Sequence, residues 1–314
     1  MTALPPPTAL YGCMGLGGSW DDAAFDDADL ARAEAAVEAA LDAGITWFDH
    51  ADIYTAGGAE AVFGALLDRH RGLRERVVLQ SKCGITLPRD GAVGHYDWRP
   101  AHVRERVERS LERLRTDRLD VLLLHRPDPL ADLAGVAATL EELHREGLVG
   151  AVGLSNASHH QLAALQAHLA LPLVADQLEM SLHHRGFVEA GVLVNTAEGS
   201  TGFPHGTLEH CAAHGVGLQA WGALAQGRYT GRAETAADVA TTELVARTAA
   251  ERGTTPETVV LWWLRRHPAR IAPVVGTTDP GRIAACRDAV LREPELTQEE
   301  WYALWVTARG APLP

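Results

Sequence analysis

The chain has 314 residues, of which 46% are hydrophobic, and a formal net charge of -13. This length suits one large α/β domain, and the acidic balance argues against a nucleic-acid partner, because nucleic-acid-binding surfaces are rich in Lys and Arg. Four widely spaced cysteines without a CxxC pair, no leader-like N-terminus and no apolar run near the ~20 residues that span a bilayer predict a cytoplasmic protein without a zinc site, a disulfide framework or a membrane segment.

Short β-rich runs alternate with longer amphipathic stretches along nearly the whole chain. The expected strands are 9–14, 44–49, 77–82, 119–125, 149–154, 173–177, 217–221 and 271–276. The expected helices are 29–43, 58–69, 100–115, 133–146, 158–168, 207–214, 256–267 and 280–290. Strict alternation requires parallel strands joined by right-handed crossovers, so the pattern predicts a single-domain (β/α)8 TIM barrel over residues 1–314.

Three further segments are expected outside this alternation. The proline-rich start, residues 1–8, should be an extended tail, and residues 192–204, rich in Gly, Ser and Thr, should form a long βα loop after the sixth strand. Thr297 and Glu300 have capping-box spacing for a final helix over 297–309. Thr255 before Pro256 similarly predicts a helix start.

A doubly wound dinucleotide fold is the main competitor of the barrel. Glycines follow the first strand at Gly12, Gly15, Gly17 and Gly18, but no clean GxGxxG opens a helix there. No acidic residue lies where a second strand would bring it to a ribose. The barrel is therefore the favoured fold.

Polar residues end several of the expected strands. In a TIM barrel, reactive groups gather at the carboxyl ends of the strands, so these residues should share one rim. They are Asp49, Lys82, His125, Ser155, Asn156 and Gln177, with Tyr54 close behind the second strand. A single polar residue at a strand end is often a helix cap or an ordinary hydrogen-bonding group, but Asp, Lys, His and Tyr on one rim predict a catalytic site.

Lys82 is the single lysine among 28 basic residues, the other 27 being arginines. It ends an apolar strand, where an ammonium is costly unless it is paired. A structural salt bridge is the ordinary explanation. The alternative, which we favour, is that an amine is required by the chemistry.

Five segments carry a family resemblance. They are Phe48-Asp49-His50-Ala51-Asp52-Ile53-Tyr54, Ser81-Lys82-Cys83-Gly84, Leu124-His125-Arg126-Pro127-Asp128, Gly153-Leu154-Ser155-Asn156 and Trp221-Gly222-Ala223-Leu224. In this order they resemble the signatures of the aldo-keto reductase superfamily, and most of all its bacterial oxidoreductase branch. The resemblance implies that Asp49, Tyr54, Lys82 and His125 form a catalytic tetrad.

The resemblance also implies hydride transfer between a nicotinamide dinucleotide and a small carbonyl or alcohol substrate. Tyr54 would be the general acid, its phenol pKa lowered by the ammonium of Lys82. Asp49 would keep that ammonium charged, and His125 would orient the substrate oxygen. No metal is required, and metal-ligand spacing is absent from the sequence.

The cofactor would be held by residues from several loops. By the resemblance, Ser155, Asn156 and Gln177 bind the carboxamide, Trp221 stacks on the nicotinamide, and the glycine-rich run after it approaches the pyrophosphate. The full expected set is Cys13, Met14, Ser155, Asn156, Gln177, Trp221, Gly222, Leu224, Gly227, Arg228, Gly276, Thr277, Thr278, Arg282 and Cys286. Arg282 suits a 2′-phosphate and favours NADP(H), whereas Gly276 and Cys286 replace a lysine and an asparagine common in relatives, so NAD(H) stays possible.

Trp20, Trp98 and the loop 192–204 are the candidates for the substrate pocket wall. Two other functions remain open. Lys82 would serve a Schiff-base lyase, and a dinucleotide-sensing regulatory subunit would keep the tetrad but show little turnover. The sequence does not address the oligomeric state.

Overall fold

A closed barrel of eight parallel strands forms the centre of the computed structural model, which describes residues 4–21, 23–88, 91–197, 199 and 201–314. Around the barrel the strand order is β1-β10-β9-β8-β7-β6-β3-β2. The strands are β1 (Leu10–Gly12), β2 (Trp47–Asp49), β3 (Val78–Cys83), β6 (Leu119–Leu124), β7 (Val149–Ser155), β8 (Leu173–Glu179), β9 (Gly217–Trp221) and β10 (Ala272–Val275). Each overlaps an expected strand, which confirms the (β/α)8 class and excludes an open doubly wound sheet.

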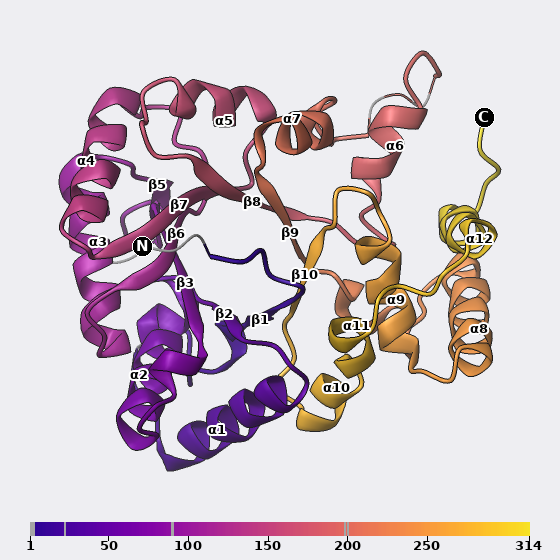
Figure 1. Cartoon of the computed structure of the whole chain (residues 1–314), viewed down its shortest axis with the longest axis horizontal. Helices are drawn as coiled ribbons and strands as arrows, with labels where there is room; N and C mark the ends of the chain where they lie inside the picture. Colours follow the sequence, from indigo (N-terminus) through magenta and orange to yellow (C-terminus); the bar gives the residue numbers. More distant parts are fainter. Residues whose placement is uncertain (1–3, 22, 89–90, 198, 200) are drawn as a thin grey trace.

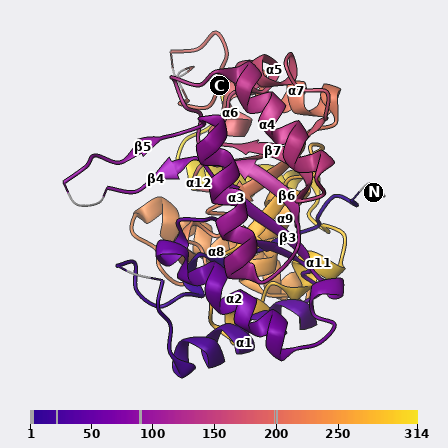
Figure 2. The ribbon, with the colours of Figure 1, turned by 90° about the vertical axis from the view of Figure 1, so that its left-hand side faces the viewer.

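Helices surround the barrel and cover its outer face (Figure 1). They are α1 (Asp27–Asp42), α2 (Gly58–Arg69), α3 (Pro100–Leu114), α4 (Leu133–Arg145), α5 (His159–Gln166), α6 (Gly186–Val192), α7 (Thr207–His214), α8 (Ala236–Glu251), α9 (Pro256–Arg265), α10 (Pro280–Ala284), α11 (Arg287–Leu291) and α12 (Gln298–Arg309). Thr255 caps α9, and Thr297 forms a capping box with Glu300 at α12, as expected. An antiparallel hairpin of β4 (Ile85–Thr86) and β5 (His95–Tyr96) projects from the molecule after β3 (Figure 2).

The interior of the barrel is divided into an apolar and a polar part. Successive side chains of a strand point to opposite faces, so residues two apart share the interior. Its apolar cluster consists of Leu10, Trp47, Val121, Leu123, Ala175, Ala272 and Val274. Two residues further along three of these strands come Asp49, His125 and Gln177. The strand period therefore directs polar side chains inward at the carboxyl end of the barrel.

The structure differs from the expected helix pattern in three places. Helix α8, which follows β9 and precedes α9 in the chain, was not expected, because its Ala- and Thr-rich sequence has no clear apolar stripe. It packs on α12 (Figure 1). The expected helix 280–290 is two short helices, α10 and α11. Helix α6 fills the start of the connection in which the loop 192–204 was expected, and residues 198 and 200 of that loop, like residues 1–3 of the tail, lie outside the described residues.

Candidate active site

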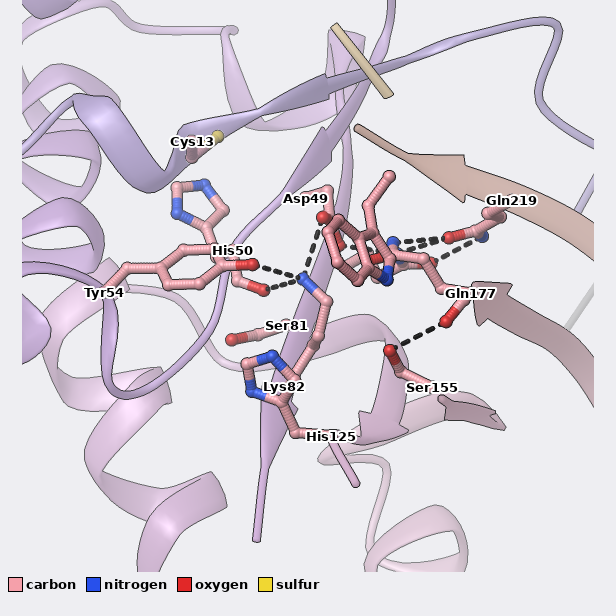
Figure 3. A network of polar contacts seen from close by, with 12 residues as sticks. Cys13, Asp49, His50, Tyr54, Ser81, Lys82, His125, Ser155, Gln177 and Gln219 are labelled. Atoms are coloured by element: carbon pink, nitrogen blue, oxygen red, sulfur yellow. Dashed lines mark hydrogen bonds and ion pairs between the residues drawn. The ribbon is translucent and has the colours of Figure 1, made fainter. Parts of the chain in front are cut away.

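Three strand ends and one short helix bring the expected tetrad together at the carboxyl end of the barrel (Figure 3). Asp49 ends β2, Lys82 is the penultimate residue of β3, and His125 directly follows β6. Tyr54 begins a short 3₁₀ helix, η2 (Tyr54–Gly57). Asp49 and Lys82 are only 2% and 1% exposed, so their charges face each other away from bulk water.

The ammonium of Lys82 uses each of its three N–H donors within the chain. Nζ donates to Asp49 Oδ2 at 2.8 Å, to the His50 carbonyl at 2.9 Å and to Tyr54 Oη at 3.1 Å. Lysine has three donors and no acceptor, so this set of bonds is complete. Because Lys82 donates to the phenol oxygen, the Tyr54 hydroxyl proton is left for another acceptor.

A chain of buried amides continues from Asp49 across the barrel interior (Figure 3). Gln80 Nε2 donates to Asp49 Oδ1 at 2.6 Å and to Gln219 Oε1 at 2.8 Å, and Gln177 Nε2 donates to the same Gln219 oxygen at 2.9 Å. Gln80 and Gln219 were not among the expected site residues. Their spacing was the available signal. Gln80 lies two residues before Lys82 on β3, and Gln219 lies two residues before Trp221 on β9.

Burial and charge set the protonation states of Lys82 and Tyr54. Burial lowers the pKa of Lys82, but Asp49 and Tyr54 raise it more, and the net pKa lies above the ordinary value. For Tyr54, burial raises the phenol pKa more than the Lys82 ammonium lowers it. The lowered pKa expected for Tyr54 is therefore wrong. Tyr54 is protonated at neutral pH, which is the form a general acid requires.

His125 is a neutral imidazole beside Tyr54. The two rings meet edge-on, with centroids 6.0 Å apart. Burial, and then the charges of Lys82 and Arg126, lower the pKa of His125 to about 2. Its Nδ1 is buried and has no hydrogen-bond partner among the described residues. One ring nitrogen of a neutral imidazole carries a hydrogen, so the group can donate one hydrogen bond without carrying charge.

The residues expected at the nicotinamide form one hydrogen-bonded group next to His125. Ser155 Oγ donates to the Gln177 carbonyl at 2.9 Å, and Asn156 Nδ2 donates to the His125 carbonyl at 3.1 Å. Trp221 Nε1 donates to Asn156 Oδ1 at 3.1 Å. Asn156 has a left-handed φ of 57°, which Asn tolerates better than most residues. The structure thus places the four expected residues on one side of the tetrad.

The segment after β9 is a tight turn with several left-handed residues. Gly222, Ala225, Gln226 and Gly227 have φ values of 68°, 46°, 56° and 85°. The amides of Ala225, Gly227 and Arg228 donate to the carbonyls of Gly222, Leu224 and Ala225, which closes the turn. A Cβ on Gly227 would lie 3.1 Å from Arg282 Nη2, so the glycine also makes room for that guanidinium. The glycine-rich run and Arg282, two parts of the expected cofactor set, thus lie next to each other.

Two other expected cofactor residues, Arg228 and Cys286, make contacts within the protein. Arg228 forms ion pairs of 2.7 Å with Asp238 and Glu234, so its guanidinium is already held by carboxylates. Cys286 is fully buried, and its Sγ donates to the Arg282 carbonyl at 3.3 Å. Its side chain therefore supports the position of Arg282.

The loops after β1 and β10 lie against each other at the rim. A Cβ on Gly15 would lie 3.1 Å from Thr278 Cγ2, and the Thr277 carbonyl accepts from Tyr11 Oη at 3.0 Å. Cys13 is buried, whereas Met14 is 53% exposed and Gly276 is exposed.

The three substrate-wall candidates differ in exposure. Trp20 is 50% exposed, whereas Trp98 is 3% exposed and packs at the base of the β4–β5 hairpin against Gly84. The Trp98 indole N–H has no partner among the described residues. A cavity of about 210 Å³ lies between α6 and the following loop, lined by Phe187, Val194 and Phe203 among others.

Within the described part of the chain, no group of three or more His, Cys, Asp or Glu residues is arranged to hold a metal ion. No described helix is long and apolar enough to cross a membrane.

Comparison with known proteins assigns the family. Residues 10–305 match the Aldo/keto reductase family, to which the chain therefore belongs. A 6-dehydroglucose reductase from Agrobacterium fabrum is 36% identical, with 91% of each chain covered. Among solved structures, a glycerol dehydrogenase from Gluconobacter oxydans has a TM-score of 0.82 at 24% identity, covering 99% of this chain and 94% of its own. An aldo/keto reductase from Klebsiella pneumoniae in complex with NADP and acetate has a TM-score of 0.73 at 26% identity, with 98% and 93% covered.

Proposed function

We propose that the chain is an NADP(H)-dependent oxidoreductase that reduces aldehydes or ketones, with Tyr54 as the general acid. The observation that carries this proposal is the triple hydrogen bonding of the Lys82 ammonium, which joins Asp49 to the phenol oxygen of Tyr54. A buried ammonium next to a protonated phenol stabilises the phenolate that remains after proton transfer.

Each group has one role in this reaction. NADPH, when bound, would supply the hydride that the carbonyl carbon accepts. The Tyr54 hydroxyl gives its proton to the carbonyl oxygen, while Lys82 stays bound to the phenol oxygen and offsets its developing charge. Neutral His125 donates its N–H to the same substrate oxygen and orients it. Solvent then returns a proton to Tyr54, and the product is an alcohol.

The cofactor assignment depends on the turn after β9 and on Arg282. This turn would bind the pyrophosphate and Arg282 the 2′-phosphate, because a guanidinium donates two parallel hydrogen bonds to a phosphate. Ser155, Asn156 and Gln177 would hold the carboxamide next to Trp221. The similar protein from Klebsiella pneumoniae was solved with NADP, which favours NADP(H) over NAD(H) here.

Sugar aldehydes belong among the first substrates to test. The 36% identical relative is named a 6-dehydroglucose reductase, and the tetrad requires only a carbonyl that reaches Tyr54 and His125. We therefore include polyhydroxylated aldehydes next to simple aliphatic and aromatic ones.

Stopped-flow oxidation of NADPH over this panel tests the function directly. We expect turnover with at least one aldehyde, and weaker binding of NADH than of NADPH. Tight NADPH binding without turnover over the whole panel would support the dinucleotide-sensing subunit. Borohydride trapping of substrate on Lys82 would support the Schiff-base lyase.

A further inference from the structure

A second group of charged residues lies between the barrel and helices α2 and α3. It consists of two carboxylates, Asp52 and Glu60, and two arginines of α3, Arg106 and Arg113. Both carboxylates are fully buried. We call these four residues the buried ion-pair network. None of them belongs to the tetrad or to the expected cofactor set.

The first ion pair holds the chain just before Tyr54. Arg106 Nε donates to Asp52 Oδ2 at 2.5 Å. The Asp52 amide in turn donates to the Lys82 carbonyl at 2.9 Å. Asp52 lies two residues before Tyr54, the proposed acid. It therefore connects this part of the chain to α3 and to the strand that carries Lys82.

The second ion pair, between Arg113 and Glu60, contacts both ends of the segment from Asp52 to Gly57. Arg113 Nη1 donates to the Asp52 carbonyl at 2.9 Å and lies 3.4 Å from Glu60 Oε2. A Cβ on Gly57, whose φ is 99°, would lie 2.3 Å from the Arg113 Cζ atom. The guanidinium thus packs directly on the backbone at the end of η2. A side chain at Gly57 would displace it.

Glu60, which lies on α2, forms a hydrogen bond to β3. Its Oε1 accepts from Ser81 Oγ at 2.7 Å, and Ser81 directly precedes Lys82. The network therefore contacts both of the backbone segments that determine the distance between Lys82 Nζ and Tyr54 Oη.

The backbone that follows Tyr54 needs such support. Thr55 and Ala56 have left-handed φ values of 46° and 55°. Residues other than glycine keep this conformation only where the surrounding structure imposes it. Buried ion pairs are poor sources of stability compared with apolar side chains of similar size, so their presence here is better explained by the geometry that they impose.

We infer that Arg106 and Arg113, with Asp52 and Glu60, are positioning residues that set the place of Tyr54 relative to Lys82. The inference rests on the proposed function for its effect on turnover. It also predicts a change at Lys82 that can be measured without turnover. None of the four side chains needs to touch substrate or cofactor.

Arg74 offers a matched control at the opposite end of the barrel. The side chains of Arg74 and Arg113 are both 21% exposed. Arg74 pairs with Asp120 at 3.0 Å and donates to the Val77 carbonyl at 3.2 Å, just before β3 begins. Arg74→Met thus removes a comparable ion pair far from Tyr54.

The test compares Arg113→Met, Arg113→Lys and Arg74→Met with the parent protein. A misplacement near 1 Å can cost about 10²-fold in rate, so we expect Arg113→Met to lower kcat at least roughly tenfold, with the Kd for NADPH within about twofold of the parent. Arg113→Lys should recover part of kcat, because Glu60 keeps a cation. Arg74→Met should lower Tm but leave kcat within about twofold, as expected for a change far from the reacting groups.

A second readout is independent of turnover. Lys82 is the single lysine, so protein labelled at lysine Cε gives one lysine NMR signal. Lys82 Nζ lies 4.9 Å from the centroid of the Tyr54 ring, so this signal responds to movement of the ring. We expect the Lys82 signal to shift in Arg113→Met and to stay at the parent position in Arg74→Met. If Arg113→Met does not fold, Arg113→Gln, which adds no second lysine, is compared in its place, with a shift again expected.

The outcomes separate the inference from the proposed function. A parent that turns over, together with Arg113 variants of parental kcat and unchanged Lys82 signal, overturns the inference alone. A parent that never turns over rejects the proposed function, and the NMR comparison then decides the inference by itself. Equal effects of Arg113→Met and Arg74→Met on kcat and on the signal would show a merely structural role and also overturn it.

Discussion

Replacing Lys82 by methionine should have two separable effects. The substitution leaves the Asp49 carboxylate buried without its cation, and breaking a buried pair in this way costs about 3–5 kcal/mol of unfolding free energy. It also removes the donor that lies 3.1 Å from Tyr54 Oη. Loss of acid-base assistance lowers rates by roughly 10²–10⁴-fold, or about 2.7–5.4 kcal/mol of activation free energy.

The double variant Asp49→Asn/Lys82→Met tells these effects apart. With no unpaired carboxylate, its unfolding free energy should recover most of the loss, whereas kcat should stay low. Lys82→Arg tests the geometry. Three acceptors converge on one nitrogen at 2.8, 2.9 and 3.1 Å, and a planar guanidinium cannot replace a compact ammonium there.

Urea unfolding and stopped-flow NADPH oxidation measure the two quantities. We expect all three variants to bind NADPH and none to regain parental kcat. Near-parental kcat in Lys82→Arg would make Lys82 a structural counter-ion and refute the tetrad mechanism.

Three other substitutions test single assignments. Tyr54→Phe should lower kcat by roughly 10²-fold or more with the Kd for NADPH unchanged, and parental turnover would reject Tyr54 as the acid. Trp221→Leu should weaken NADPH binding and reduce the fluorescence quench in a titration; an unchanged quench would show that another tryptophan reports. Arg282→Ala should weaken NADPH but not NADH, because only the former has a 2′-phosphate, and equal weakening in parallel titrations would contradict that contact.

The sequence was sufficient for the barrel and for the position of Asp49, Lys82 and His125 because both depend on local periodicity, whereas Tyr54 was assigned to the tetrad through the family resemblance. An apolar strand that ends in a polar residue shows which side chain reaches the carboxyl rim, as at Asp49, Lys82 and His125. The closed order of the strands then brings these ends together. The sequence therefore predicted that Asp49, Lys82 and His125 lie close together, although they are far apart in the chain.

What the sequence did not reveal depends on long-range packing. The His50 carbonyl, which accepts from Lys82, has no sequence signal, because every residue has a carbonyl group. Gln80 and Gln219 are 139 positions apart, so their pairing follows only from barrel closure. The raised pKa of Tyr54 results from a balance between burial and charge, and burial is known only from the folded structure.

Burial of His50 gives a final prediction, on the pH dependence of stability. Its ring is fully buried and packs edge-on to Phe63 at 4.8 Å, and neither ring nitrogen has a partner among the described residues. Burial, and then the charge of Lys82, lower its pKa from 6.5 to about 3. In this interval the unfolded chain binds a proton that the folded protein does not. The contribution of the neutral ring is therefore complete above the unfolded pKa and is lost as the pH falls towards the folded one.

A comparison of parent and variant is needed because Asp52 acts with the opposite sign. Burial, only partly offset by Arg106, raises the pKa of Asp52 from 3.8 to about 7, so the carboxylate that pairs with Arg106 takes up a proton at a higher pH in the folded protein than in the unfolded chain. The two contributions offset each other in the parent. In His50→Leu only the contribution of His50 disappears. The carbonyl of residue 50, which accepts a hydrogen bond from Lys82, remains. Between pH 6 and 5 the unfolding free energy of the variant should thus rise by about 1 kcal/mol relative to that of the parent in urea titrations. An unchanged difference between the two proteins would mean that His50 takes up its proton in the folded state as it does in the unfolded chain, and its burial as a neutral ring would be wrong.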